Sequence, residues 1–362
     1  MPKPRIRDLG IPLEGTPGEF NAITDVKGIR VGHTTLISGN GTLEVGKGPI
    51  RTGVTAILTR EEGGRLQFGA WDTLNGCGEI TGTTWLDESG FLYGPILITN
   101  TASVSVVKDA ATKWKHLHNY SWGFPIVTET YDGLLNDTFG FHIKEEHTWS
   151  ALDNATSGLV LEGNVGGGTG MICHEFKGGI GSSSRVVREE TASFTVGVLV
   201  QANYGARKNL RVAGVPVGLE ITDLMPEHYP GMASSKNSSI IVVVATDCPL
   251  LPHQLKRLCK RVPLGIARVG GNADNLSGDI FVAFSTAPLG EANPQGIRQV
   301  GMYPNEEMDP LFEAVIQATE EAILNSLVAA ETMTGINGHT AYALPIDRLK
   351  EVMRKYNRFV DQ

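Results

Sequence analysis

The chain has 362 residues, of which 41% are hydrophobic and 19% charged, so it can bury a sizeable core as one large domain or two smaller ones. Its net charge of −8 at pH 7 argues against binding to nucleic acid or to an anionic membrane surface. The N-terminus lacks the apolar segment of a secretory signal, no apolar run approaches the roughly 18 residues of a spanning helix, and the cysteines show no CxxC spacing. We therefore expect a cytoplasmic protein with reduced thiols and no membrane partner.

Short apolar runs rich in β-branched residues predict the strands of the fold. In chain order they cover Gly53–Thr59, Pro95–Asn100, Pro125–Thr130, Gly158–Glu162, Phe194–Gln201, Ile240–Thr246 and Ile280–Ser285. Amphipathic or capped segments predict helices at 103–118, at Leu251–Val262 and from Asp309 to about Thr334. Many strand runs are apolar throughout, and strands and helices are mixed without a strict βαβ alternation. We predict an α/β fold, a layered sandwich with sheets in the middle and helices outside.

Two serines precede the most apolar of these strands, in the stretch KNSSIIVVVATDCP at 236–249. Residues 222–238 are polar and rich in serine, which is typical of a flexible connection, and they lead directly to Ser239. The hydroxyl of Ser239 either begins an ordinary buried strand or belongs to a nucleophile at a bond that the connection presents for cleavage.

Three further groups of polar residues stand at the ends of predicted strands. Glu129 and Tyr131 stand at the end of the strand at 125–130, Asn203 follows the strand at 194–201, and Ser277 and Asp279 precede the strand at 280–285. Residues two apart on a strand share a face, so Ser277 and Asp279 can meet one group together. The amide of Asn203 can donate to an oxyanion. Each group can also serve only as a hydrogen-bonded turn or strand end.

Nucleotide and metal sites are not favoured by the sequence. The glycine-rich segment 162–170 follows a predicted strand, but no Lys-Ser/Thr pair follows it, and a tight turn with close backbone packing is the better interpretation. No HExxH motif is present, and His116 and His118 are expected on an exposed helical turn. We expect no metal and no cofactor.

Several longer stretches, in this order, resemble the L-aminopeptidase/D-Ala-esterase/amidase (DmpA-like) family, which includes the β-peptidyl aminopeptidases. The resemblance runs from about residue 10 to residue 345. It is carried by NAITDVKGIRVGHTTL at 21–36, NGCGEITGTTWLDESG at 75–90, ETYDGLLND at 129–137, GNVGGGTGMICHEFKGGIGSSSR at 163–185, VLVQANYG at 198–205, SIIVVVATDCPL at 239–250 and SGDI at 277–280.

The resemblance implies an αββα sandwich similar to that of N-terminal-nucleophile hydrolases. It also implies one catalytic domain, residues 1–362, that is made inactive and cuts itself between Ser238 and Ser239. The large chain 1–238 and the small chain 239–362 would stay together and assemble as a homotetramer. Two residues depart from the family pattern: Ser238 stands where Gly or Asn is common, and Asp279 stands where Glu is common.

The resemblance also implies a role for each candidate. Ser239 is the nucleophile, Ser277 and Asp279 orient it, Asn203 and Tyr131 stabilise the oxyanion, and Glu129 binds the ammonium of the substrate. Chemistry supports the first assignment, because an N-terminal serine carries its own base, an α-amine with a pKa of about 7.7–8.0.

The expected substrates are small peptides, amino-acid amides or esters, and the sequence leaves open whether α-, β- or D-amino acids are preferred. A self-processing acyltransferase and an unprocessed pseudoenzyme are the alternative functions.

Overall fold

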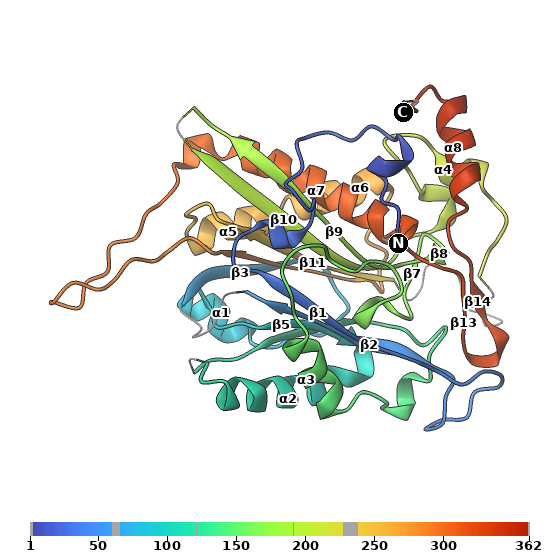
Figure 1. Cartoon of the computed structure of the whole chain (residues 1–362), viewed down its shortest axis with the longest axis horizontal. Coiled ribbons are helices and arrows are strands. Elements are labelled where there is room, and N and C mark those ends of the chain that lie inside the picture. The colour runs from blue at the N-terminus through green and yellow to red at the C-terminus, as the bar shows by residue number, and fades with distance from the viewer. Residues whose placement is uncertain (1–2, 60–65, 121, 191, 227–237, 361–362) are drawn as a thin grey trace.

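The computed structural model describes residues 3–59, 66–120, 122–190, 192–226 and 238–360. Two β-sheets face each other, and helices cover the outer face of each sheet (Figure 1). The layered α/β sandwich predicted from the sequence is therefore confirmed. Most of the predicted connection to Ser239, residues 227–237, lies outside the described residues. Within the described ranges, no helix combines the length and the apolar character needed to cross a bilayer.

The first sheet has the order β1-β2-β5-β6. Its strands are β1 (Arg30–Ser38), β2 (Ile50–Leu58), β5 (Ile96–Asn100) and β6 (Ile126–Thr130). Its outer face packs on α2 (Val104–Leu117) and α3 (Glu145–Asp153), whose apolar residues form one core with Val54, Leu97 and Val127. The helix predicted at 103–118 is thus present as α2.

The second sheet has the order β4-β3-β12-β11-β10-β9. Its strands are β3 (Gln67–Gly76), β4 (Phe91–Leu92), β9 (Gly179–Arg188), β10 (Ser193–Asn203), β11 (Ser239–Thr246) and β12 (Gly278–Ser285). Its outer face packs on α5 (Pro252–Cys259), α6 (Val262–Val269) and α7 (Asp309–Val328). Strands β11 and β12 are parallel, so Ser239 and Gly278 begin side by side at the same edge.

Smaller elements complete the chain. They are α1 (Thr83–Ser89), α4 (Val217–Glu220), α8 (Ile346–Lys355) and the short strand pairs β7 (Ile172–Cys173) with β8 (Phe176–Lys177) and β13 (Met333–Thr334) with β14 (Thr340–Ala341). The four cysteines are free thiols, of which only Cys77 is exposed.

Alternate side chains of β11 enter two different hydrophobic cores. Ile240, Val242 and Val244 pack toward the helices, whereas Ile241 and Val243 fill the space between the two sheets. Ser239 has the same parity as Ile241, so its side chain belongs to the face between the sheets. Here Gln201 crosses from β10 to the first sheet, where its Nε2 donates to the Thr99 carbonyl oxygen at 3.0 Å and to Thr130 Oγ1 at 2.8 Å.

Three sequence predictions of elements are wrong in part or in whole. The run Gly158–Glu162 is not a strand, because Leu159 and Leu161 are exposed and the backbone makes only an isolated bridge nearby, between Gly163 and Ile180. The helix predicted at Leu251–Val262 is present as α5 but ends earlier, at Cys259, and Val262 instead begins a second helix, α6, which has a proline in its first turn. The long helix ends at Val328, before Thr334, which instead pairs in β13.

Candidate active site

Ser239 is the first residue of β11 and lies in a row across three strands. It pairs with Asn203 at the end of β10 and with Gly278 at the start of β12. Its side chain is buried, with 6% of the residue exposed. Three of the sequence-predicted segments, 203, 239 and 277–279, therefore meet at one sheet edge.

The peptide bond before Ser239 is held by two donors. Ser239 Oγ donates to the carbonyl oxygen of Ser238 at 2.7 Å, and the backbone N–H of Gly278 lies 3.3 Å from that oxygen and 3.1 Å from Ser239 Oγ. The serine hydroxyl thus lies next to the carbonyl that it would attack, and an amide dipole points at the oxygen that would become negative. The Gly278 amide was missed by sequence reasoning, although the SGDI stretch that contains it was singled out.

Ser277 and Asp279 meet as their spacing predicted. Ser277 Oγ donates to Asp279 Oδ1 at 2.6 Å, and both residues are buried. Burial raises the pKa of the Asp279 carboxyl to about 6, and the hydrogen bond from Ser277 opposes that rise. Among the described residues neither side chain hydrogen-bonds to Ser239. The parity of β12 places Asp279 with Phe281, on the helix-covered face of the sheet, whereas Ser239 belongs to the other face.

Asn203 is held at both ends of its amide. Oδ1 accepts from the backbone N–H of Ile172 at 2.8 Å, and Nδ2 donates to the carbonyl oxygen of Tyr131 at 2.9 Å. The structure therefore brings the backbone of Tyr131 to Asn203. The phenol of Tyr131 folds beside Gly133, against the turn after β6. Its predicted role toward the oxyanion stays a prediction.

Glu129 lies on β6 in the facing sheet and is 4% exposed. Oε1 accepts from the backbone N–H of Glu79 at 2.9 Å, and Oε2 accepts from Thr101 Oγ1. Burial raises the pKa of the Glu129 carboxyl, and these two hydrogen bonds oppose the rise. A buried carboxylate held by neutral donors favours a cationic partner.

Gly78 lies between Glu129 and the Ser239 row, the row formed across three strands by Asn203, Ser239 and Gly278. A methyl group on its Cα would lie 3.3 Å from Glu129 Oε1 and 3.4 Å from the Cα of Gly278. The two residues therefore flank the same glycine. Sequence reasoning missed Gly78 and Thr101 as parts of the site; the signal available was the GCGE segment inside the family-like stretch 75–90.

The glycine-rich segment is a packing element. Gly166–Gly168 forms a 3-10 turn, and Gly167 lies so close to Gln201 Oε1 that no side chain would fit. The tight turn expected from the sequence is confirmed. His116 and His118 are exposed on the last turn of α2 and just after it, and no group of three metal-ligating side chains occurs in the described ranges.

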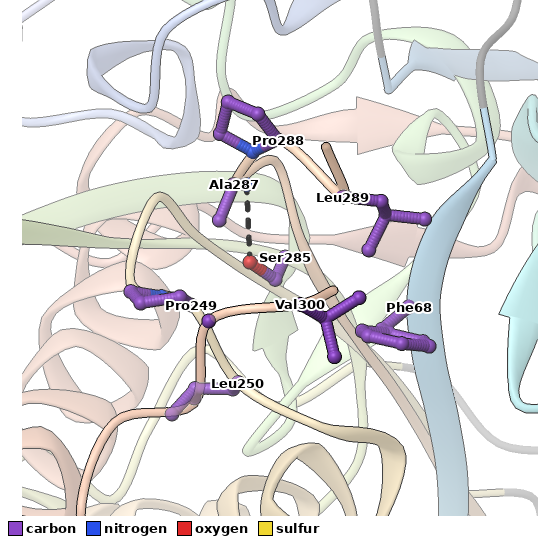
Figure 2. Close-up of a pocket in the computed structure, with 9 residues that line it drawn as sticks. Phe68, Pro249, Leu250, Ser285, Ala287, Pro288, Leu289 and Val300 are labelled. Carbon is purple, nitrogen blue, oxygen red and sulfur yellow. Dashed lines mark hydrogen bonds between the residues drawn. The ribbon is translucent and has the colours of Figure 1, made fainter. Parts of the chain in front are cut away.

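A separate pocket lies at the other end of the same strands (Figure 2). Its lining includes Ser285 at the end of β12, which donates to the Cys248 carbonyl oxygen at 2.6 Å, and the apolar residues Phe68, Leu250 and Val300. Ser285 is seven residues along β12 from Gly278, which corresponds to about 23 Å. This pocket is distinct from the Ser239 site.

A family model, peptidase family S58, matches residues 21–341. This chain belongs to peptidase family S58. It is 53% identical over 371 residues to a β-peptidyl aminopeptidase, BapA, of Sphingosinicella microcystinivorans, with 98% of this chain and 93% of that protein covered. The identity to BapA of Sphingosinicella xenopeptidilytica is 47%, with coverage of 97% and 91%.

Solved structures of similar proteins have the same fold. The L-aminopeptidase D-Ala-esterase/amidase of Ochrobactrum anthropi, described as a prototype for the serine aminopeptidases and a variant of the Ntn-hydrolase fold, superposes with a TM-score of 0.92 at 43% identity, covering 99% of this chain and all of that one. A Burkholderia β-aminopeptidase gives a TM-score of 0.87 at 46% identity, with coverage of 97% and 99%. The fold expected from the resemblance is thus confirmed, and this S58 chain is a hydrolase with serine aminopeptidase/amidase function.

Proposed function

We propose that this S58 chain cuts itself between Ser238 and Ser239 and then releases N-terminal residues from small peptides, amino-acid amides or esters through an acyl-enzyme on Ser239. The observation that carries the proposal is the hydrogen bond from Ser239 Oγ to the Ser238 carbonyl oxygen, with the Gly278 amide beside both atoms. In this proposal the single domain 1–362 becomes a large chain, 1–238, and a small chain, 239–362.

Self-cleavage would proceed in two balanced steps. Ser239 Oγ attacks the carbonyl carbon of Ser238, the C–N bond breaks, and the hydroxyl proton passes to the departing nitrogen. The resulting ester is hydrolysed by water, which leaves a carboxylate on Ser238 and a free α-amine and hydroxyl on Ser239. Before this step the nitrogen of Ser239 is an amide and cannot act as a base, so the uncut chain would be inactive toward substrates.

The cut enzyme would use the groups around Ser239 in separate roles. The α-amine accepts the hydroxyl proton while Oγ attacks the substrate, and Ser277 with Asp279 keeps the amine oriented. Asn203 Nδ2 stabilises the oxyanion, with Tyr131 as a second candidate donor. Glu129 holds the ammonium group of the substrate, which restricts the reaction to the first residue of a peptide. Water then releases the acid, and no metal or cofactor takes part.

Substrate preference, assembly and location complete the proposal. Because two relatives are named β-peptidyl aminopeptidases, we expect N-terminal β-amino acids to be accepted. We expect a cytoplasmic homotetramer of cut pairs. Free thiols are consistent with the location. Residues 290–302 are consecutively exposed and include the apolar Ile297, and part of this segment extends away from the body (Figure 1), which supports self-association. Light scattering during gel filtration measures the assembly.

Denaturing electrophoresis with N-terminal sequencing tests the cleavage. The purified protein should give two bands, the smaller beginning Ser-Ile-Ile-Val. Ser239→Ala should stay as one band and show no amidase activity, whereas Ser238→Ala should cut at the same bond. A small fragment beginning Ser-Ser-Ile would assign the nucleophile to Ser238. Wild-type turnover by an uncut Ser239→Ala protein would refute the mechanism, and transfer of the acyl group to an added amine in preference to water would indicate an acyltransferase.

A further inference from the structure

Tyr204 follows directly after Asn203 and is fixed from several sides. It is 4% exposed and packs in the core on the helix-covered face of the second sheet. Its ring meets the His174 ring edge to face, with centroids 4.9 Å apart, and its carbonyl oxygen accepts from the His174 backbone N–H at 2.6 Å. On another side a methyl group on Gly271 would lie 2.8 Å from Cε2 of the ring. The phenol is therefore held in one place.

Two buried polar atoms near this place have no hydrogen bond to any residue that the structure describes. One is the hydroxyl oxygen of Tyr204, and the other is Oδ2 of Asp279. Asp279 uses only Oδ1, which accepts from Ser277. Burying an unsatisfied donor and an unsatisfied acceptor is costly, and such groups in a native structure call for an explanation.

The strand register places these two atoms on the same face. Asn203 lies opposite Ser239, and Ser239 lies opposite Gly278, so the next residues outward, Tyr204, Ser238 and Ser277, share one level. The alternation of side chains puts all three on the helix-covered face, together with Asp279. In the uncut chain Ser238 therefore stands between Tyr204 and the Ser277–Asp279 pair.

The charges around the two groups agree with this placement. Burial raises the pKa of the Tyr204 phenol well above its ordinary value, and the nearby Cys173 and Asp279 raise it further. The pKa of Asp279 is raised by burial, lowered by the hydrogen bond from Ser277 and raised by the nearby Asp274. Near pH 7 both His174 and Cys173 are neutral, because burial lowers the pKa of His174 to about 4 and raises that of Cys173 to about 12.

We propose that Tyr204 is a positioning residue of the processed enzyme, in which its hydroxyl donates a hydrogen bond to Oδ2 of Asp279. Cleavage removes the covalent bond between Ser238 and Ser239 and so frees the residue that separates the two groups. Asp279 then has a donor on each oxygen, Ser277 on Oδ1 and Tyr204 on Oδ2, and stays ionised beside the new α-amine. The inference rests on the proposed role of Asp279.

A pH profile distinguishes this role from a purely structural one. Tyr204→Phe removes the donor, so the pKa of Asp279 should rise by about one unit, and kcat/KM at pH 6 should fall about fivefold to tenfold more than at pH 8. Tyr303→Phe is the matched control. Tyr303 lies beyond the far end of β11, where its backbone N–H donates to the Pro249 carbonyl oxygen, so removal of its hydroxyl should leave the pH profile unchanged. Sequencing of the small chain first establishes that each variant is cut.

A double-mutant cycle and a second substitution complete the test. In an Asp279→Asn background, Tyr204→Phe should cause no further loss if the tyrosine acts through the carboxylate. An equal loss at every pH, or fully additive losses, would overturn the inference. If Asp279→Asn itself keeps wild-type activity, the proposed function of Asp279 fails instead. Should Tyr204→Phe not fold, 3-fluorotyrosine at 204 decides: the more acidic phenol should move the acid limb to lower pH, and an unmoved limb would refute the inference.

Discussion

Asn203 and Ser239 lie directly opposite each other on the antiparallel strands β10 and β11. Side chains at opposite positions share a face, with Cβ atoms about 4.5–5.5 Å apart, so the amide stands beside the proposed nucleophile. The amide is also fixed in its plane by the Ile172 N–H and the Tyr131 carbonyl oxygen. A donor held in this way needs no reorganisation when charge develops on the substrate, which is the requirement for an oxyanion hole.

Asn203→Asp tests this donor with little change of shape. The aspartate keeps an oxygen for the Ile172 N–H but loses the Nδ2 donor, and we expect kcat to fall about 10²–10³-fold, or about 2.7–4 kcal/mol. Asn203→Ala would remove both contacts and lower stability as well. Steady-state kinetics on a p-nitroanilide substrate measures the effect. If the Asn203→Asp protein still cuts itself and its kcat stays near the wild-type value, Asn203 has no role in the mechanism.

Glu129→Gln tests recognition of the substrate ammonium. The wild-type enzyme should prefer an aminoacyl p-nitroanilide over its N-acetylated form by at least about tenfold to hundredfold in kcat/KM, because acetylation leaves the buried carboxylate without its cationic partner. Glu129→Gln should weaken turnover of the free amine and reduce this ratio. Thr101→Val is a useful comparison, since it removes one donor to Glu129 and keeps the charge. Equal rates on both substrates with the wild-type enzyme would contradict the aminopeptidase assignment.

Gly78→Ala tests the close approach between Glu129 and the Ser239 row. The added methyl would lie 3.3 Å from Glu129 Oε1 and 3.2 Å from Ile280 Cδ1, so one of these groups must shift. We expect KM to rise about threefold to tenfold, which corresponds to about 0.7–1.4 kcal/mol of binding free energy. Gly76→Ala, at the last residue of β3, is the matched control, because a methyl there meets no atom within 4 Å. A similar change of KM in both variants would show that Gly78 has no special role.

Parts of this site follow from short-range rules and could be predicted. The contact between Ser277 and Asp279 follows from the two-residue period of a strand, and the buried strand after Ser239 follows from its β-branched residues. The parallel pairing of β11 with β12 does not follow from either segment alone. That pairing brings the Gly278 amide to the Ser238 carbonyl, which explains why the amide was missed.

Other elements were missed because their residues satisfy each other over long distances. Strand β9 contains three buried serines and reads as polar, yet Ser183 Oγ donates to the Ala318 carbonyl oxygen of α7 at 2.6 Å. The opposite error occurred at Gly158–Glu162. There the apolar residues Leu159 and Leu161 are exposed, and Glu162 is buried because Arg5 pairs with it. Hydrophobic pattern alone cannot distinguish these cases, since the partners lie far away in the sequence.

The pKa of Asp279 gives the last prediction, a pH dependence of activity whose midpoint is set in part by Ser277. Burial raises this pKa to about 6 and the Ser277 hydrogen bond opposes the rise, so activity that needs the carboxylate should fall as the pH drops through about 6. Ser277→Ala removes the hydrogen bond, raises the pKa further and should move this limb to higher pH, while Asp279→Asn should lack it. The α-amine, with a pKa of about 7.7–8.0, titrates in every variant and appears as a separate limb. The same pKa affects stability. Because the native state binds the Asp279 proton more tightly than the unfolded chain does, the contribution of Asp279 to the free energy of unfolding decreases as the pH rises from about 4 to about 6. Urea unfolding of Asp279→Asn at pH 4.5 and 7 should show less of this decrease than wild type. A limb that stays in place in Ser277→Ala would mean that the hydrogen bond between the two residues does not govern the ionisation used in catalysis.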